Sequence, residues 1–136
     1  CDATVTTTIN KVIKENQGIA NISVIPPFYS NEAFVKSSAN VISENLTEKF
    51  DHLLFSYHSL PESQVKNGDP YADEILETVD LIMENFHGYG HSLCYQSKMR
   101  PIKWLEPDID AELLELYNRG IRNILVFPVS FVSENL

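Results

Sequence analysis

A histidine that directly follows a long apolar run has the clearest chemical potential in this sequence. His58 ends the stretch FDHLLFSYH, and Pro61 closes the run three residues later. A neutral imidazole can accept a proton near pH 7 or bind a divalent transition metal. The alternative is a structural histidine, satisfied by a backbone carbonyl in a loop. Pro61 would hold the local backbone and leave the imidazole facing a cleft, but position alone leaves both interpretations open.

Polar and aromatic residues also follow the two later apolar runs. Gln96 and Lys98 come after Leu93–Cys94–Tyr95, and Ser130 and Phe131 come at the end of NILVFPVSF. Lys98, with the nearby Arg100, can neutralise carboxylates of an anionic ligand, but taken alone these charges favour an ordinary solvated strand end.

Trp104 lies in the proline-containing segment PIKW. An indole in such a loop either packs in the core or forms the wall of a pocket for a flat ligand. The sequence does not choose between these two roles.

Several other patterns favour structural roles. The segment HGYGH, from His87 to His91, resembles a metal pair, but its two glycines indicate a loop rather than a helix that would align both rings. Four carboxylates at spacings of 4, 3 and 4 form the solvated face of a predicted helix: Asp73, Glu77, Asp80 and Glu84. His52 is expected to be structural, and Asp69 is expected to bond to backbone in a turn.

The overall composition excludes several classes of protein. The 136 residues carry a net charge of −9, with 43% hydrophobic and 21% charged residues. This is a globular composition of one-domain size, without general affinity for nucleic acid or anionic lipid. No apolar run approaches the ~20 residues of a membrane-spanning helix. Two distant cysteines, Cys1 and Cys94, indicate a reducing compartment, and we predict the cytoplasm.

Apolar runs alternate with helical patterns along the chain. The periodicity predicts helices over residues 4–16, 31–50, 71–86 and 110–118, and strands over residues 22–25, 53–57, 92–96 and 123–131. This alternation predicts an α/β fold, a three-layer Rossmann-like domain with a four-stranded parallel sheet and helices on both faces. Residues 1–20 form a helical segment leading into a domain over residues 21–136. Because ligands bind beyond the carboxyl ends of such strands, His58, Gln96 and Ser130–Phe131 should line one cleft.

Four segments, in this order, resemble the ferrochelatase family: LLFSYHSLPES, NGDPYADEI, CYQSKMRPIKWLEP and NILVFPVSFVSENL. The resemblance covers nearly the whole chain. It implies a chelatase-like fold of two similar domains with a porphyrin cleft between them, of which this chain is the second. It also implies a lyase that inserts Fe²⁺ into protoporphyrin IX to form protohaem, the last step of haem biosynthesis.

The resemblance assigns roles by position. His58 matches the essential histidine, expected to be catalytic and to contact the metal, while Gln96, Trp104, Ser130 and Phe131 are expected to bind substrate. The chain departs from the family at two places. Arg100 stands where glycine is common, and Asn135 stands where many members have a second histidine.

The resemblance also sets expectations about partners and completeness. The essential glutamate of the family would lie one position beyond Leu136, and the first domain is missing, so we expect a fragment that is inactive alone. Fe²⁺ and porphyrin are substrates, and no tightly bound cofactor is predicted. Cys1 lies near an iron–sulfur ligand of some members, but no cluster is predicted. Peripheral membrane contact is expected only through the missing domain.

Other functions remain open from the sequence. One is insertion of iron into coproporphyrin III; the sequence His-Ser-Leu-Pro at residues 58–61 weakly favours protoporphyrin. A second is a non-catalytic α/β domain that binds a tetrapyrrole or a metal. A third is a regulatory module that binds an acidic metabolite at the strand ends.

Overall fold

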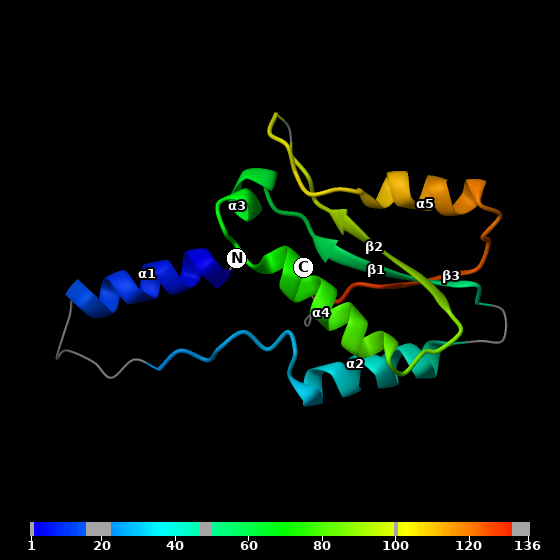
Figure 1. Cartoon of the computed structure of the whole chain (residues 1–136), viewed down its shortest axis with the longest axis horizontal. Helices are drawn as coiled ribbons and strands as arrows, with labels where there is room; N and C mark the ends of the chain where they lie inside the picture. The colour runs from blue at the N-terminus through cyan, green and yellow to red at the C-terminus, as the bar shows by residue number, and fades with distance from the viewer. Residues whose placement is uncertain (1, 16–22, 47–49, 100, 132–136) are drawn as a thin grey trace.

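A small parallel sheet between two layers of helices forms the centre of the structure (Figure 1). The computed structural model describes residues 2–15, 23–46, 50–99 and 101–131. The strands are β1 (His52–His58), β2 (Gly90–Gln96) and β3 (Ile124–Phe127), in the order β2-β1-β3 with both pairs parallel. The helices are α1 (Asp2–Glu15), α2 (Glu32–Asn45), α3 (Glu62–Lys66), α4 (Tyr71–Met83) and α5 (Ile109–Asn118).

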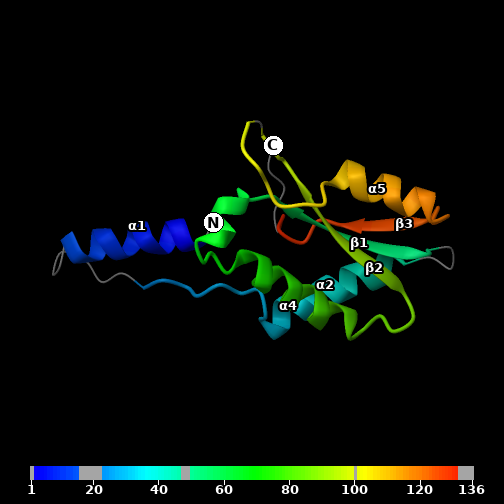
Figure 2. The same cartoon turned by 45° about the horizontal axis from the view of Figure 1, so that its top comes forward.

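The central strand β1 is buried on both faces. Leu53, Phe55 and Tyr57 belong to a core with α2 and α4, whereas Leu54 packs with Cys94 and Leu116 of α5. Figure 2 shows α2 and α4 on one side of the sheet and α5 on the other. A strand covered on both faces needs apolar side chains at successive positions, which explains the unbroken run Leu-Leu-Phe. The predicted three-layer α/β fold is therefore confirmed.

The larger core lies between the sheet and the pair of helices α2 and α4. Its fully buried members include Ile42 from α2, Phe55 from β1 and Ile82 from α4. Complete burial of such a side chain contributes about 1.5–3 kcal/mol. Three of the predicted solvated carboxylates lie on α4 and the fourth, Glu84, caps its end; all four are exposed. This amphipathic division holds α4 against the sheet.

The predicted fourth strand, residues 22–25, is wrong for its described part. Residues 23–25 form no strand, Ile22 lies outside the described residues, and Ile25 is 86% exposed. A strand needs a neighbour that completes its hydrogen bonds, and Pro26 and Pro27 remove two donors directly afterwards. The described sheet therefore has three strands rather than four.

Other boundaries differ for local reasons. The helix predicted over residues 31–50 begins at Glu32, where the Asn31 side chain accepts the N–H groups of Ala33 and Phe34, and it ends at Asn45. The last strand stops at Phe127 because Pro128 cannot donate to the ladder. Residues 59–70, between the predicted strand and the next predicted helix, contain the short helix α3. The predicted boundary near residue 20 lies outside the described residues.

The two predicted structural roles of His52 and Asp69 are confirmed. The Asp69 carboxylate accepts the N–H of Tyr71 at 3.0 Å and so starts α4. His52 is 2% exposed, and its Nε2 lies 2.9 Å from the Ser92 hydroxyl. Gly90 leaves room for the ring, because a Cβ at that position would lie 3.0 Å from His52 Nδ1.

The surroundings of His52 favour its neutral form. Burial lowers the pKa of His52, and the positive charge of Arg119 adds to this effect. His91 lowers the pKa further, whereas Glu112 opposes the shift. The folded protein therefore binds a proton at His52 less readily than the unfolded chain does.

We expect this histidine to make stability depend on pH. An unfolded histidine titrates near pH 6.5, so below about this value the unfolded chain binds the extra proton while folded His52 resists it. The free energy of unfolding should therefore fall as the pH drops from 7.5 to 5.5, and it should fall less in His52→Gln. Urea unfolding at both pH values measures the difference.

His87→Ala, which removes an exposed imidazole, is the control and should keep the wild-type dependence of the unfolding free energy on pH. Equal pH dependence in His52→Gln and the wild type would contradict the assignment.

Candidate functional site

His58 presents an exposed imidazole on a firmly held backbone. It is the last residue of β1, the central strand of the sheet. Its N–H donates to the Ser130 hydroxyl at 3.1 Å, and its carbonyl accepts the Tyr71 hydroxyl at 2.8 Å. The next N–H, of Ser59, donates to the Gln96 carbonyl at 2.8 Å. The ring therefore projects from a peptide that neighbouring elements hold on both sides.

The turn after β3 brings an aromatic ring to His58. Beyond Pro128, the N–H of Phe131 donates to the Pro128 carbonyl, and Val129 is buried in the core at 4% exposed. The His58 and Phe131 ring centroids lie 6.5 Å apart at an interplanar angle of 75°, an edge-to-face arrangement. Phe131 is 39% exposed, so one part of its ring remains available to a ligand.

Gln96 completes the group at this edge of the sheet. It is directly opposite His58 in the β1–β2 register and is half-buried. The following residue, Ser97, has a φ of +68°, which turns the chain away from the sheet. The structure thus brings together His58, Gln96, Ser130 and Phe131, as the rule for parallel strand ends predicted.

Trp104 occupies a different position. Its segment runs antiparallel to the residues after β1, with Trp104 opposite Pro61. The N–H of Glu62 donates to the Lys103 carbonyl at 3.0 Å, and the indole N–H donates to the Met99 carbonyl. Pro61 therefore provides a surface on which the Trp104 loop docks.

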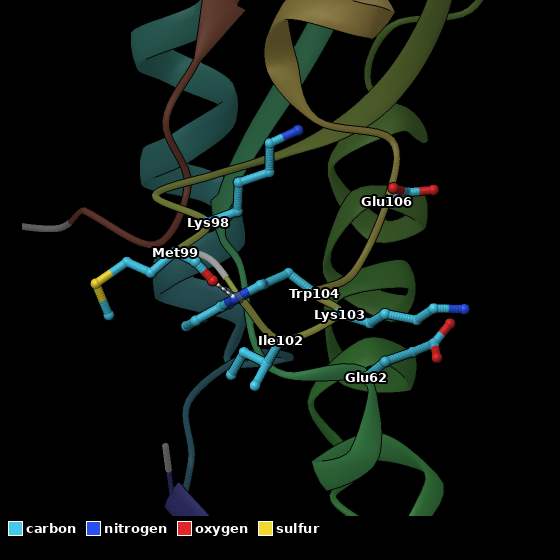
Figure 3. A pocket seen from close by; sticks show the side chains of 7 residues that line it. All are labelled: Glu62, Lys98, Met99, Ile102, Lys103, Trp104 and Glu106. Atoms are coloured by element: carbon cyan, nitrogen blue, oxygen red, sulfur yellow. Dashed lines mark hydrogen bonds between the residues drawn. The ribbon is translucent and has the colours of Figure 1, made fainter.

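Trp104 lines a pocket of about 300 Å³ together with six neighbours: Glu62, Lys98, Met99, Ile102, Lys103 and Glu106. Figure 3 shows the indole between the Met99 and Lys103 side chains. His58 is not among the residues that line this pocket. The indole is half-buried, so it forms a pocket wall rather than part of the core. The Trp104 pocket is thus separate from the group that His58 forms with Gln96, Ser130 and Phe131.

Of the two predicted cationic residues, Lys98 and Arg100, only Lys98 lies in the described part of the chain. The Lys98 ammonium forms an ion pair with Asp108, and Figure 3 shows it directed away from Trp104. Asp108 also caps α5, because its carboxylate accepts the Ala111 N–H at 2.9 Å. Arg100 lies outside the described residues, as do Cys1 and residues 132–136.

The two histidines of the HGYGH segment lie in different local structures. His91 was predicted to lie in a loop, but it is the second residue of β2, and its ring lies edge-to-face to Phe55 at 6.3 Å. His87 lies in the preceding turn, as predicted. Within the described part of the chain, no three histidine, cysteine or acidic side chains gather in a group that could hold a metal.

Tyr71 was missed by the sequence reasoning. Its hydroxyl contacts the His58 carbonyl, although it is thirteen residues away in the chain. The sequence showed only that Tyr71 follows a turn and begins an amphipathic helix. A side chain that bonds to a main-chain carbonyl leaves no periodic pattern, and this explains the omission.

Comparison with known proteins now decides the family. The family model described as Ferrochelatase matches residues 1–136. The chain belongs to the ferrochelatase family. It is 38% identical over 132 residues to the ferrochelatase of Citrifermentans bemidjiense, covering 94% of this chain and 42% of that protein. It is 44% identical over 116 residues to the ferrochelatase of a Sulfurihydrogenibium species, covering 84% of this chain and 35% of that protein.

A plant relative covers the same share of this chain as the Citrifermentans protein. The chain is 37% identical over 139 aligned residues to "Ferrochelatase-2, chloroplastic" of Hordeum vulgare, covering 94% of this chain and 29% of that protein. The chain thus spans less than half the length of these ferrochelatases. None of the helices in the described ranges is both long and apolar enough to cross a membrane.

The double role of Asp108 can be tested with two substitutions. Asp108→Ala removes both the helix cap and the ion pair with Lys98, and should cost about 0.5–2 kcal/mol of stability. Asp108→Ser keeps a capping hydroxyl and removes only a partly exposed ion pair, which is typically worth ~1 kcal/mol or less. Chemical denaturation should therefore rank the wild type above Asp108→Ser and Asp108→Ser above Asp108→Ala. Equal stability of the two variants would contradict the capping role.

Proposed function

We propose that the protein carrying this chain inserts Fe²⁺ into protoporphyrin IX to form protohaem. In this proposal, the chain supplies one wall of the porphyrin site. The observation that carries the proposal is the exposed imidazole of His58, held at the carboxyl end of the central strand with the Phe131 ring beside it. Membership of the ferrochelatase family supports the same reaction.

The reaction requires the kind of group that His58 provides. Two pyrrole N–H protons must leave the macrocycle, and the metal must lose its bound water. A flat macrocycle resists both steps because its nitrogen lone pairs point inward in the ring plane, so bending the ring exposes them. A neutral imidazole on one face can accept the protons or guide the ion. We assign His58 to this role.

The aromatic and polar neighbours of His58 suit a flat substrate. The exposed part of Phe131 can pack against a porphyrin face. The Ser130 hydroxyl accepts the His58 N–H, so its own proton can still be donated to a ligand. Gln96 adds an amide at the same edge, and Trp104 offers a second aromatic surface in its own pocket. We propose substrate contacts for these four residues.

Iron fits this site as a substrate in transit. A single imidazole is one ligand, whereas stable protein sites for transition metals combine several. His58 would therefore contact the ion briefly during its transfer to the porphyrin nitrogens.

We also propose the cytoplasm as the compartment. Cys94 is a free, buried thiol, and a free thiol suits a reducing environment. The barley relative is named as chloroplastic, so the compartment differs among relatives. The net charge of −9 argues against nucleic acid as a partner.

Replacing His58 tests the proposed reaction. In the whole protein, His58→Ala should lower the rate of metal insertion by roughly 10²–10⁴, the usual contribution of a positioned acid–base group. Porphyrin binding should remain, because the aromatic surface is intact. A continuous assay with porphyrin and Fe²⁺ or Zn²⁺ measures the rate, and quenching of porphyrin fluorescence measures binding.

His87→Ala is the matched control, because it removes an exposed imidazole in the turn before β2. It should retain wild-type turnover. Near-normal insertion by His58→Ala would contradict the assignment of His58. Porphyrin binding by the whole wild-type protein without any metal insertion would instead favour a non-catalytic tetrapyrrole-binding protein.

A further inference from the structure

The peptide of His58 lies where the β1–β3 ladder has already ended. The register of these strands runs from His52–Ile124 to Phe55–Phe127, and Pro128 follows. His58 is therefore three residues beyond the last β1–β3 pair. There, two side-chain hydroxyls make the hydrogen bonds to the main chain of His58 in place of a strand. Ser130 accepts its N–H, and Tyr71 donates to its carbonyl.

Tyr71 is well placed to hold this carbonyl. It is the first residue of α4, and its own N–H donates to the Asp69 carboxylate at 3.0 Å. Ile75 and Ile82 anchor the helix in the core, being 3% and 0% exposed. The hydroxyl is thus attached to a rigid element outside the sheet.

We propose that the Tyr71 hydroxyl positions His58 for catalysis, an inference that rests on the proposed function of His58. The bond at 2.8 Å fixes the main chain from which the imidazole projects, and so keeps the ring edge-to-face to Phe131. A reacting group that is displaced by about 1 Å can lose much of its rate advantage. Tyr71 acts through His58 and does not itself need to contact the porphyrin.

Tyr57 provides a matched control. Both tyrosines line the same cavity of about 170 Å³. The Tyr57 hydroxyl is buried, and within the described residues it has no hydrogen-bond partner. Replacing either tyrosine with phenylalanine removes one oxygen and keeps the ring, but only Tyr71→Phe removes a bond to His58.

The test compares these two variants in the whole protein. Tyr71→Phe should lower kcat about three- to tenfold, the usual effect of losing one hydrogen bond, with KM for porphyrin changed by less than about twofold. Tyr57→Phe should leave both constants at wild-type values. Titration with porphyrin counts the folded sites, so that kcat refers to folded enzyme alone.

A spectroscopic measurement separates positioning from simple stabilisation. The ¹H–¹³C signal of the His58 ring, assigned by its loss in His58→Ala, should broaden or split in Tyr71→Phe and stay unchanged in Tyr57→Phe. If Tyr71→Phe matches Tyr57→Phe in kcat and in this signal, the inference is overturned. The inference is also overturned if Tyr71→Phe lowers only the melting temperature and leaves kcat and the His58 signal unchanged.

The outcomes also distinguish this inference from the proposed function. An inactive His58→Ala with a fully active Tyr71→Phe removes only the positioning role of Tyr71. A fully active His58→Ala removes the catalytic role of His58, and the positioning role fails with it.

Discussion

Burial of β1 on both faces determines where every other part of this structure can lie. Phe55 and Leu54 are completely buried, and they point into different layers of helices. Because side chains alternate along a strand, a shift of one residue would turn each side chain of β1 toward the opposite layer of helices. The register of β1 is therefore strongly fixed. That register places His58 at the end of the strand, at the carboxyl edge of the sheet.

The chemistry at this edge follows from the end of the hydrogen-bonding ladder. Pro128 ends β3, so His58 is beyond the last pair on that side. The same proline begins the turn that carries Ser130 and Phe131 back to His58. A peptide that lacks a strand partner on one side still needs hydrogen bonds there when it borders a core, and here side chains supply them. The backbone is held firmly while the imidazole remains exposed, which is the arrangement that a proton-accepting group requires.

Several of these features could be predicted from the sequence. The unbroken apolar run predicted a doubly covered strand and placed His58 at its end. The parallel topology then brought His58, Gln96 and Phe131 together, because the carboxyl ends of parallel strands share one edge. The amphipathic pattern of α4 was also sufficient to predict its buried face.

Other features depend on contacts that leave no local pattern. Residues 23–25 have the composition of a strand, but no neighbour among the described residues completes their hydrogen bonds. Composition alone cannot reveal a missing partner. Tyr71 contacts His58 through one hydrogen bond, from its side-chain hydroxyl to the main-chain carbonyl, and such a bond leaves no periodic pattern in the sequence. The separate pocket of Trp104 follows from docking of its loop on Pro61, a contact between segments more than forty residues apart.

We propose that the exposed imidazole of His58 faces the reacting centre of a porphyrin. An experimental structure of the whole protein with a bound porphyrin tests it most directly, through the distance from the His58 ring nitrogens to the pyrrole nitrogens. We expect the imidazole to face the centre of the macrocycle, with the Phe131 ring packed against the same ligand. A porphyrin bound elsewhere, with His58 turned away from the pyrrole nitrogens, would contradict the account.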